Sequence, residues 1–108
     1  MIYMNIYSNL DTVEDNELLR VMRNAKTNHQ SSVSGYENYI KNKNSKGCAI
    51  ESHYNKMNRF ETIFEICYAE CVRRSLDKRN SQIVRVKDGY EKTCLRRAYL
   101  CEVYDNRF

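Results

Sequence analysis

The longest regular pattern of apolar positions lies between residues 52 and 79. Apolar side chains recur there every three or four residues, which places them on one face of an α-helix: Met57, Phe60, Ile63, Phe64, Cys67, Tyr68, Cys71 and Val72. Ser52 is a suitable N-terminal cap. Beyond Val72 the same face carries Arg74 and Lys78, so we expect the last turns to project into solvent. The pattern predicts a long central helix with Cys67 and Cys71 facing the core.

Two weaker helical patterns flank this central helix. Residues 12–26 carry an apolar stripe behind a cap at Asp11 or Thr12, and a stripe of similar spacing begins at Tyr90. The run KTNHQSSVSG after the first pattern predicts a loop that contains His29, followed by a short turn with Tyr36 and Tyr39. Asn80 and Ser81 should end or turn the central helix. IVRV at 83–86 is compatible with a strand or with another helix, and Asp88-Gly89 predicts a turn. The two stripes consist of Val13, Leu18, Val21, Met22 and Ala25, and of Tyr90, Cys94, Ala98, Cys101 and Tyr104.

These elements predict a mainly α-helical protein with one small domain over residues 1–108. A chain of 108 residues closes one hydrophobic core and has no room for a second. Residues 1–10 begin with an alternating pattern that fits a short strand or an arm, and residues 41–51 read as an exposed basic loop. We expect the central and C-terminal helices to pack antiparallel through their cysteine faces.

Charge and targeting signals limit the partners and the compartment. The net charge is +4, and the whole of this basic excess lies in residues 67–108, with ten bases against six acids. This is a modest excess, which permits weak attraction to acidic partners without defining a nucleic-acid-binding protein. No apolar run approaches the length of a membrane span, and the first residues do not resemble a secretory signal. We therefore expect a cytoplasmic protein, in the host cell if it is viral, with reduced cysteines.

The cysteines permit a crosslinked helical hairpin. Cys67 and Cys71, one turn apart, are poorly placed to bridge each other, and Cys94 lies two turns from Cys101. A hairpin turning near residue 83 would bring Cys71 opposite Cys94 and Cys67 opposite Cys101, which allows nested disulfides. This layout resembles the twin-cysteine helical hairpins of the mitochondrial intermembrane space. The resemblance covers about 40 residues, and the Cys94-x6-Cys101 spacing departs from the CxxxC and Cx9C patterns of that family.

The same residues suggest two other interpretations. Cys48, His53, Cys67 and Cys71 supply three thiols and an imidazole at loosely finger-like intervals, so they are a candidate structural zinc site, although no CxxC knuckle is present. The simplest alternative is that the cysteines are reduced, buried and bound to no cofactor.

The sequence contains no motif that indicates a catalytic site. There are two histidines, His29 and His53, with no arrangement that indicates a triad. The Cys67-x5-Arg73 spacing matches that of tyrosine phosphatases, but the intervening YAECV has no glycine, has helical periodicity and contains Glu70, which would repel phosphate. We therefore expect a protein that is not an enzyme.

Basic pairs and tyrosines are the candidate partner-binding residues. The arginines and lysines near the predicted hairpin turn could converge at one end and contact nucleic acid, although interleaved acids cancel part of their field. Tyrosine and arginine are also enriched in protein interface hot spots. The candidates are Arg73, Arg74, Lys78, Arg79, Arg96, Arg97, Tyr36 and Tyr39.

Together, these features favour a small binding protein whose partner is another protein. Its size and its composition, rich in Asn, Lys and Ile, suggest a phage or viral accessory factor that inhibits a host protein or a nucleic-acid-handling defence complex, as an anti-CRISPR protein does. The alternatives are a nucleic-acid-binding module, with or without zinc, and a disulfide-stabilised helical hairpin.

Overall fold

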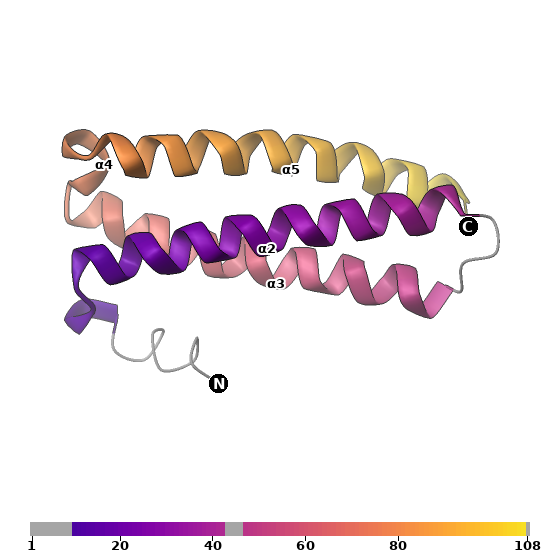
Figure 1. Ribbon diagram of the computed structural model, residues 1–108, viewed down its shortest axis with the longest axis horizontal. Helices are drawn as coiled ribbons and strands as arrows, with labels where there is room; N and C mark the ends of the chain where they lie inside the picture. Colours follow the sequence, from indigo (N-terminus) through magenta and orange to yellow (C-terminus); the bar gives the residue numbers. More distant parts are fainter. Residues whose placement is uncertain (1–9, 43–46, 108) are drawn as a thin grey trace.

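Three long helices form an elongated bundle in the computed structural model (Figure 1), which describes residues 10–42 and 47–107 apart from the side chains of residues 79 and 105–107. A short 3-10 turn, η1 (Leu10–Thr12), precedes α2 (Asp15–Lys41), and α3 (Gly47–Arg73) runs back beside it. The short α4 (Leu76–Arg79) then leads into α5 (Ser81–Arg107), which runs parallel to α2. The prediction of a mainly α-helical fold is confirmed. The strand or arm expected at residues 1–10 lies almost wholly outside the described residues.

Two apolar clusters divide the interior along the bundle axis. Each long helix has 27 residues, or about 40 Å at 1.5 Å per residue, and the molecule measures 46 × 27 × 16 Å. The first cluster, nearer α4, includes Leu18, Met22 and Phe64, and the second, toward the other end, includes Tyr36 and Met57. α3 and α5 each pack most extensively against α2. The seam between α3 and α5 is therefore more open than the seams that α2 forms with each of these helices.

The loop predicted for residues 26–35 is wrong, because α2 continues through it to Lys41. His29, Val33 and Tyr36 extend the apolar stripe of the first turns, and all three are almost completely buried. The hydroxyl of Ser32 donates a hydrogen bond to the carbonyl oxygen of Asn28 at 2.9 Å, so this polar side chain is satisfied within the helix. Burial against α3 and α5 outweighs the modest helix propensity of the segment.

The turn predicted at Asp88-Gly89 is also wrong, since α5 is continuous from Ser81. Ile83 and Val86 before the glycine face the core together with Tyr90 and Leu100 after it. A glycine inside a helix costs about 1 kcal/mol relative to alanine. The burial of this stripe offsets that cost.

The bounds of the central helix differ from the expected 52–79. α3 begins at Gly47 and Ile50 is fully buried, so the predicted exposed loop at 41–51 is wrong at its C-terminal end, while residues 43–46 lie outside the described residues. α3 ends at Arg73 because Ser75 adopts a left-handed conformation with φ 60°. The break expected at Asn80 is confirmed, and its side-chain oxygen accepts a hydrogen bond from the backbone N–H of Gln82 at 2.9 Å.

The chain reverses direction after Arg73, earlier than the predicted turn near residue 83. This changes which residues of α3 and α5 lie opposite each other in the proposed disulfide hairpin. Phe64 stacks on Tyr90 at 3.9 Å between ring centroids, so Cys71, two turns further along α3, is level with the first turns of α5 rather than with Cys94. Cys67 and Cys71 are buried as predicted, Cys94 and Cys101 are half-buried, and no disulfide joins any two of the five described cysteines. The nested pairing of Cys71 with Cys94 and of Cys67 with Cys101 is therefore not supported by the register.

Candidate functional site

A groove of about 420 Å³ follows the seam between α3 and α5. Its floor is formed by Tyr90 and Cys94, and Leu95 forms part of its rim with 75% of its surface exposed. The remaining lining residues are charged and come from both helices: Glu61, Glu65, Lys87 and Glu91. The groove combines an apolar floor with polar walls, which is the usual make-up of a binding site in a protein surface.

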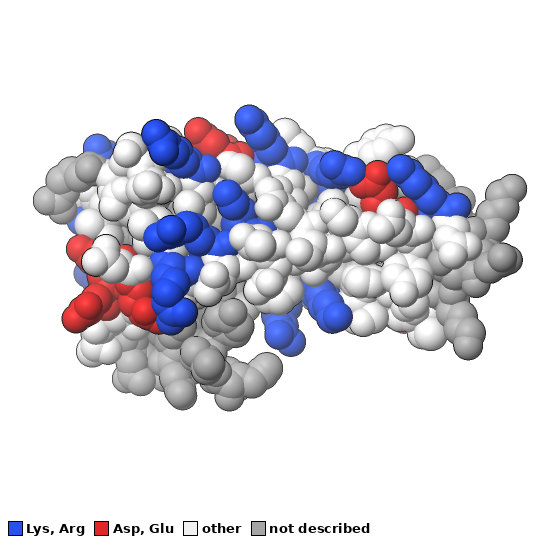
Figure 2. Space-filling view, in the orientation of Figure 1, with Lys and Arg blue, Asp and Glu red and all other residues white. Residues whose placement is uncertain are grey.

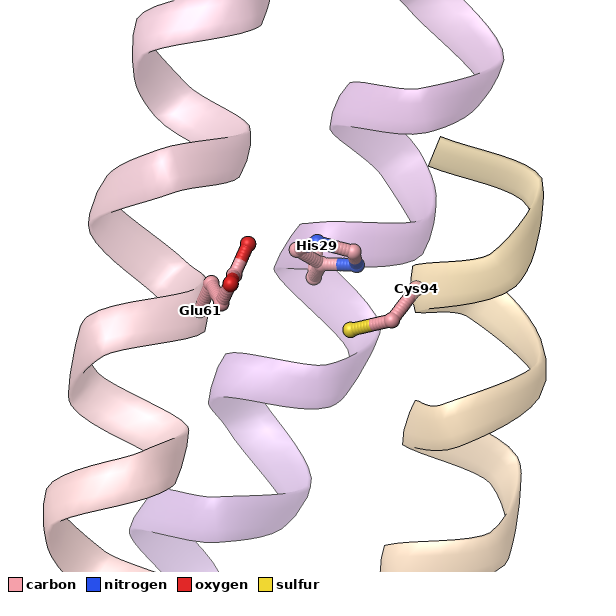
Figure 3. Close-up of side chains that lie close together, drawn as sticks. All are labelled: His29, Glu61 and Cys94. Carbon is pink, nitrogen blue, oxygen red and sulfur yellow. The ribbon is translucent and has the colours of Figure 1, made fainter. Parts of the chain in front are cut away.

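A histidine, a carboxylate and a thiol meet beside this groove. His29 from α2, Glu61 from α3 and Cys94 from α5 point toward one another (Figure 3), and one potential ligand atom from each lies within 4.8 Å of the other two. His29 is completely buried, whereas Glu61 and Cys94 are half-buried and also line the groove. The cluster therefore joins the interior of the bundle to its surface.

His29 is held in its neutral form. Burial, and secondarily the charge of Arg97, lowers the pKa of its imidazole from 6.5 to about 4. Within the described part of the chain neither ring nitrogen has a hydrogen-bond partner, and the ring lies 5.3 Å from that of Tyr90. Burial also raises the pKa of the Cys94 thiol, although a hydrogen bond with Tyr90 and the charge of Arg97 oppose the shift. At neutral pH the cluster thus holds a neutral imidazole and a protonated thiol.

Arg97 fixes the carboxylate of the cluster. Its guanidinium pairs with Glu61 and donates a hydrogen bond from Nη2 to Oδ1 of Asn58 at 2.7 Å. Both partners are on α3, so this arginine ties α5 across the open seam. The sequence predicted Arg97 as a partner-binding residue, and the structure places it inside the seam as a positioning residue.

The other predicted arginines do not converge at one end of a hairpin. Arg74 is half-buried and donates hydrogen bonds to the carbonyl oxygens of Leu10 and Val13, at 2.9 and 2.6 Å, so the prediction that it projects into solvent is wrong. Arg73 pairs with Glu70 on the same helix. Lys78 is exposed on α4, and the side chain of Arg79 lies outside the described residues.

Arg96 and the two predicted tyrosines lie in the half of the bundle away from α4. Arg96 pairs with Glu37 of α2. Tyr36 is completely buried, with its ring 5.6 Å from that of Tyr104, so it is part of the core rather than of a binding surface. Tyr39 is 37% exposed, and its ring lies 5.0 Å from that of His53.

The predicted zinc ligands are spread along a single helix. Cys48, His53, Cys67 and Cys71 all belong to α3, and Cys48 lies about 34 Å from Cys71 along the axis at 1.5 Å per residue. Burial raises the pKa of both Cys67 and Cys71 to about 11. These four residues cannot bind one metal ion within one chain, because a straight helix keeps them apart.

Leu95 and Tyr99 of α5 are exposed apolar residues that are absent from the candidates predicted from the sequence. They lie one helical turn apart and expose 75% and 65% of their surfaces. The sequence nevertheless contains a signal: a helix beginning at Ser81 buries positions 83, 86, 90, 93 and 100, which leaves 95 and 99 outside the stripe. The stripe drawn from Tyr90 placed Ala98 in the core, whereas Ala98 is exposed.

Basic side chains lie beside this apolar pair, on the side of α5 that faces α2. Figure 2 shows Lys and Arg spread over the face that α2 and α5 form, with acidic side chains clustered mainly at its left end. Lys26 lies across Gly89, and Lys92 and Arg96 line a second groove of about 360 Å³ between the two helices. This face is an alternative candidate for contact with an acidic partner.

Comparisons of the chain with protein-family models, with curated proteins and with solved structures gave no match. Among the described residues, no helix combines the length and the apolar character that crossing a membrane requires. The fold and the site therefore define this protein only as a small helical bundle with an open seam between α3 and α5.

Proposed function

We propose that this chain is a small non-enzymatic binding protein that recognises another protein through α5 and the groove beside it. The observation that carries the proposal is the exposure of Leu95 and Tyr99 on adjacent turns of α5. Large apolar side chains that lie together in solvent are typical of interaction surfaces, and tyrosine is enriched among interface hot spots. Leu95 also borders the groove, so a partner side chain inserted there would contact both features.

Within the class of non-enzymatic binding proteins, we propose more specifically an inhibitor. A protein that acts by occupying a site on its target needs no catalytic residues, which fits an inhibitor of a host protein or of a nucleic-acid-handling defence complex. We place the interaction in the cytoplasm, where the five cysteine thiols would stay reduced.

The test is a comparative capture experiment in cells of the source organism. The L95A/Y99A double variant and the wild type are expressed at equal levels, and the co-purifying proteins are quantified by mass spectrometry. We expect the specific partner to be lost at least about 30-fold, the equivalent of a hot spot of about 2 kcal/mol. Val84→Ala, an exposed residue on the same helix, is the matched control. Equal capture by the double variant and the wild type would contradict the proposal.

A nucleic-acid-binding module is the second candidate, now on a different surface from the one that the sequence suggested. Lys26 of α2 lies across Gly89 of α5, and Lys92 lines the second groove. Arg23, one turn before Lys26, and Arg85, one turn before Gly89, are exposed. If these four side chains contact phosphates, log affinity should fall with log salt at a slope of about −3.6. The R23A/K92A variant should weaken that slope by about half. No binding to RNA or DNA at low salt removes this candidate.

A further inference from the structure

We propose that His29, Glu61 and Cys94 form a binding site for a divalent transition-metal ion of the zinc class. The three side chains come from three different helices and converge on one point (Figure 3), with potential ligand atoms within 4.8 Å of one another. Tetrahedral Zn²⁺, with bonds of about 2.0–2.3 Å, keeps its ligand atoms about 3.3–3.8 Å apart. Inward shifts of at most about 1.5 Å would therefore complete the site.

The unpartnered imidazole of His29 is the independent observation that indicates a ligand. His29 is completely buried, and neither Nδ1 nor Nε2 has a hydrogen-bond partner among the residues that the structure describes. A buried polar group without a hydrogen-bond partner destabilises the folded state, so folded proteins normally satisfy such groups. A metal ion bound by one of the nitrogens would satisfy it, and the ring already lies between Glu61 and Cys94.

The donor atoms select the class of metal. Imidazole nitrogen, thiolate sulfur and carboxylate oxygen are the ligands that Zn²⁺ takes in proteins, whereas Mg²⁺ and Ca²⁺ prefer sites built from oxygen alone. Three protein ligands leave a fourth position open. Because Glu61 and Cys94 also line the α3–α5 groove, that position can be reached from solvent.

The surroundings of the three ligands support a bound cation. One carboxylate and one thiolate supply two negative charges to the site, although Glu61 shares its charge with Arg97, and the proton of the Cys94 thiol passes to solvent when the Zn–S bond forms. Arg97 holds the Glu61 carboxylate from the side and is itself held by a hydrogen bond to Asn58, which is the kind of outer hydrogen bonding that orients metal ligands. The site is distinct from the Cys48, His53, Cys67 and Cys71 set, with which it shares no residue.

The experiment is a titration of the full-length, metal-free protein with Zn²⁺ and, separately, with Co²⁺. We expect one equivalent to bind, with a Co²⁺ spectrum that contains a thiolate charge-transfer band and with slower alkylation of Cys94. Cys94→Ser should abolish the charge-transfer band, and His29→Leu should weaken binding by at least about a hundredfold. Cys48→Ser, which changes an exposed thiol outside the cluster, should bind as the wild type does.

The design separates failure to bind from failure to fold. Each variant is first checked for wild-type helicity and a cooperative thermal transition without metal, and Cys94→Ala and His29→Gln replace any variant that does not fold. The absence of stoichiometric binding by the wild type overturns the proposal and indicates that water or nothing occupies the space beside His29. Binding that survives in both the His29 and the Cys94 variants, or that is lost in Cys48→Ser, overturns it as well.

Discussion

Burial decides which of the five thiols can react. Cys67 and Cys71 have no exposed surface, and the Sγ of Cys71 lies 3.5 Å from the Sδ of Met22. Burial raises the pKa of both thiols from the ordinary 9.0 to about 11, so their reactive thiolate forms are about a hundredfold scarcer than usual. They are therefore components of the apolar core.

We predict that a thiol-alkylating reagent distinguishes these cysteines in the native protein. Cys48, exposed near the start of α3, should be modified first, and Cys67 and Cys71 should react at least about a hundredfold more slowly because they are both inaccessible and protonated. Peptide mass spectrometry over a time course measures each rate. Fast labelling of Cys67 without denaturant would show that the first apolar cluster opens readily.

A second prediction concerns His29 in the metal-free protein. Replacing it with leucine removes two unsatisfied nitrogens from the interior, and an apolar residue of similar size should pack against Tyr90. We expect His29→Leu to be as stable as the wild type or more stable by about 1 kcal/mol, measured by urea unfolding with a chelator present. A loss of more than about 1 kcal/mol would mean that the imidazole makes a hydrogen bond through a buried water.

At the scale of the elements, two glycines occupy opposite situations in two long helices. A Cβ added at Gly35 of α2 would lie 2.5 Å from Cε1 of His53 on α3, and that ring is itself packed against Tyr39. A Cβ added at Gly89 of α5 would meet mainly the flexible end of Lys26, at 3.1 Å from its Nζ. The first glycine allows close approach of two helices, while the second has no such role.

This contrast predicts opposite effects of the same substitution. Gly35→Ala should destabilise the protein by about 1 kcal/mol or more, because the overlap with His53 exceeds the gain in helix propensity. Gly89→Ala should stabilise it by up to about 1 kcal/mol, since the lysine side chain can move aside. Thermal unfolding of both variants measures the difference. If both variants change stability in the same direction, the close contact at Gly35 is not as described.

For the whole molecule, Glu70 and Arg74 join the end of α3 to the segment that precedes α2. Glu70 is almost completely buried and pairs with Arg73 and Arg74. Arg74 in turn pairs with Asp15 at 2.9 Å and donates to the carbonyl oxygen of Leu10. Hydrogen bonding by Arg73, and then by Arg74, lowers the pKa of Glu70 from 4.5 to about 2.

The fourth prediction follows from the sign of this shift. Because the pKa of Glu70 is lower in the folded than in the unfolded protein, its contribution to stability is complete above about pH 4.5 and is lost as the pH falls toward about 2. Glu70→Gln should cost about 2 kcal/mol at neutral pH and progressively less below about pH 4.5. Urea unfolding across this range measures the difference, and Glu17→Gln in an exposed pair is the control that should change little. A difference that does not shrink in acid would show that Glu70 acts through packing alone.

The sequence by itself determined the fold class and part of the interior. The periodicity from Met57 to Cys71 and from Leu18 to Ala25 marked helical faces that are indeed buried, because burial of an apolar stripe is a local property of the sequence. The length of α2 and α5 could not be predicted in the same way. Gly89 and the polar run around His29 have weak helix propensity, and only packing against neighbouring helices keeps them helical.

Only the tertiary structure decided which chemical groups meet. The register across α3, α4 and α5 depends on the reversal at Ser75, and it brings Cys94 to Glu61 and His29 rather than to Cys71. The same register places Arg97 inside the seam and leaves Leu95 and Tyr99 in solvent. A helical stripe indicates which side chains face inward, but the position of the turn sets what they face, because each shift of one residue moves a helix by about 1.5 Å and rotates its contacts by about 100°.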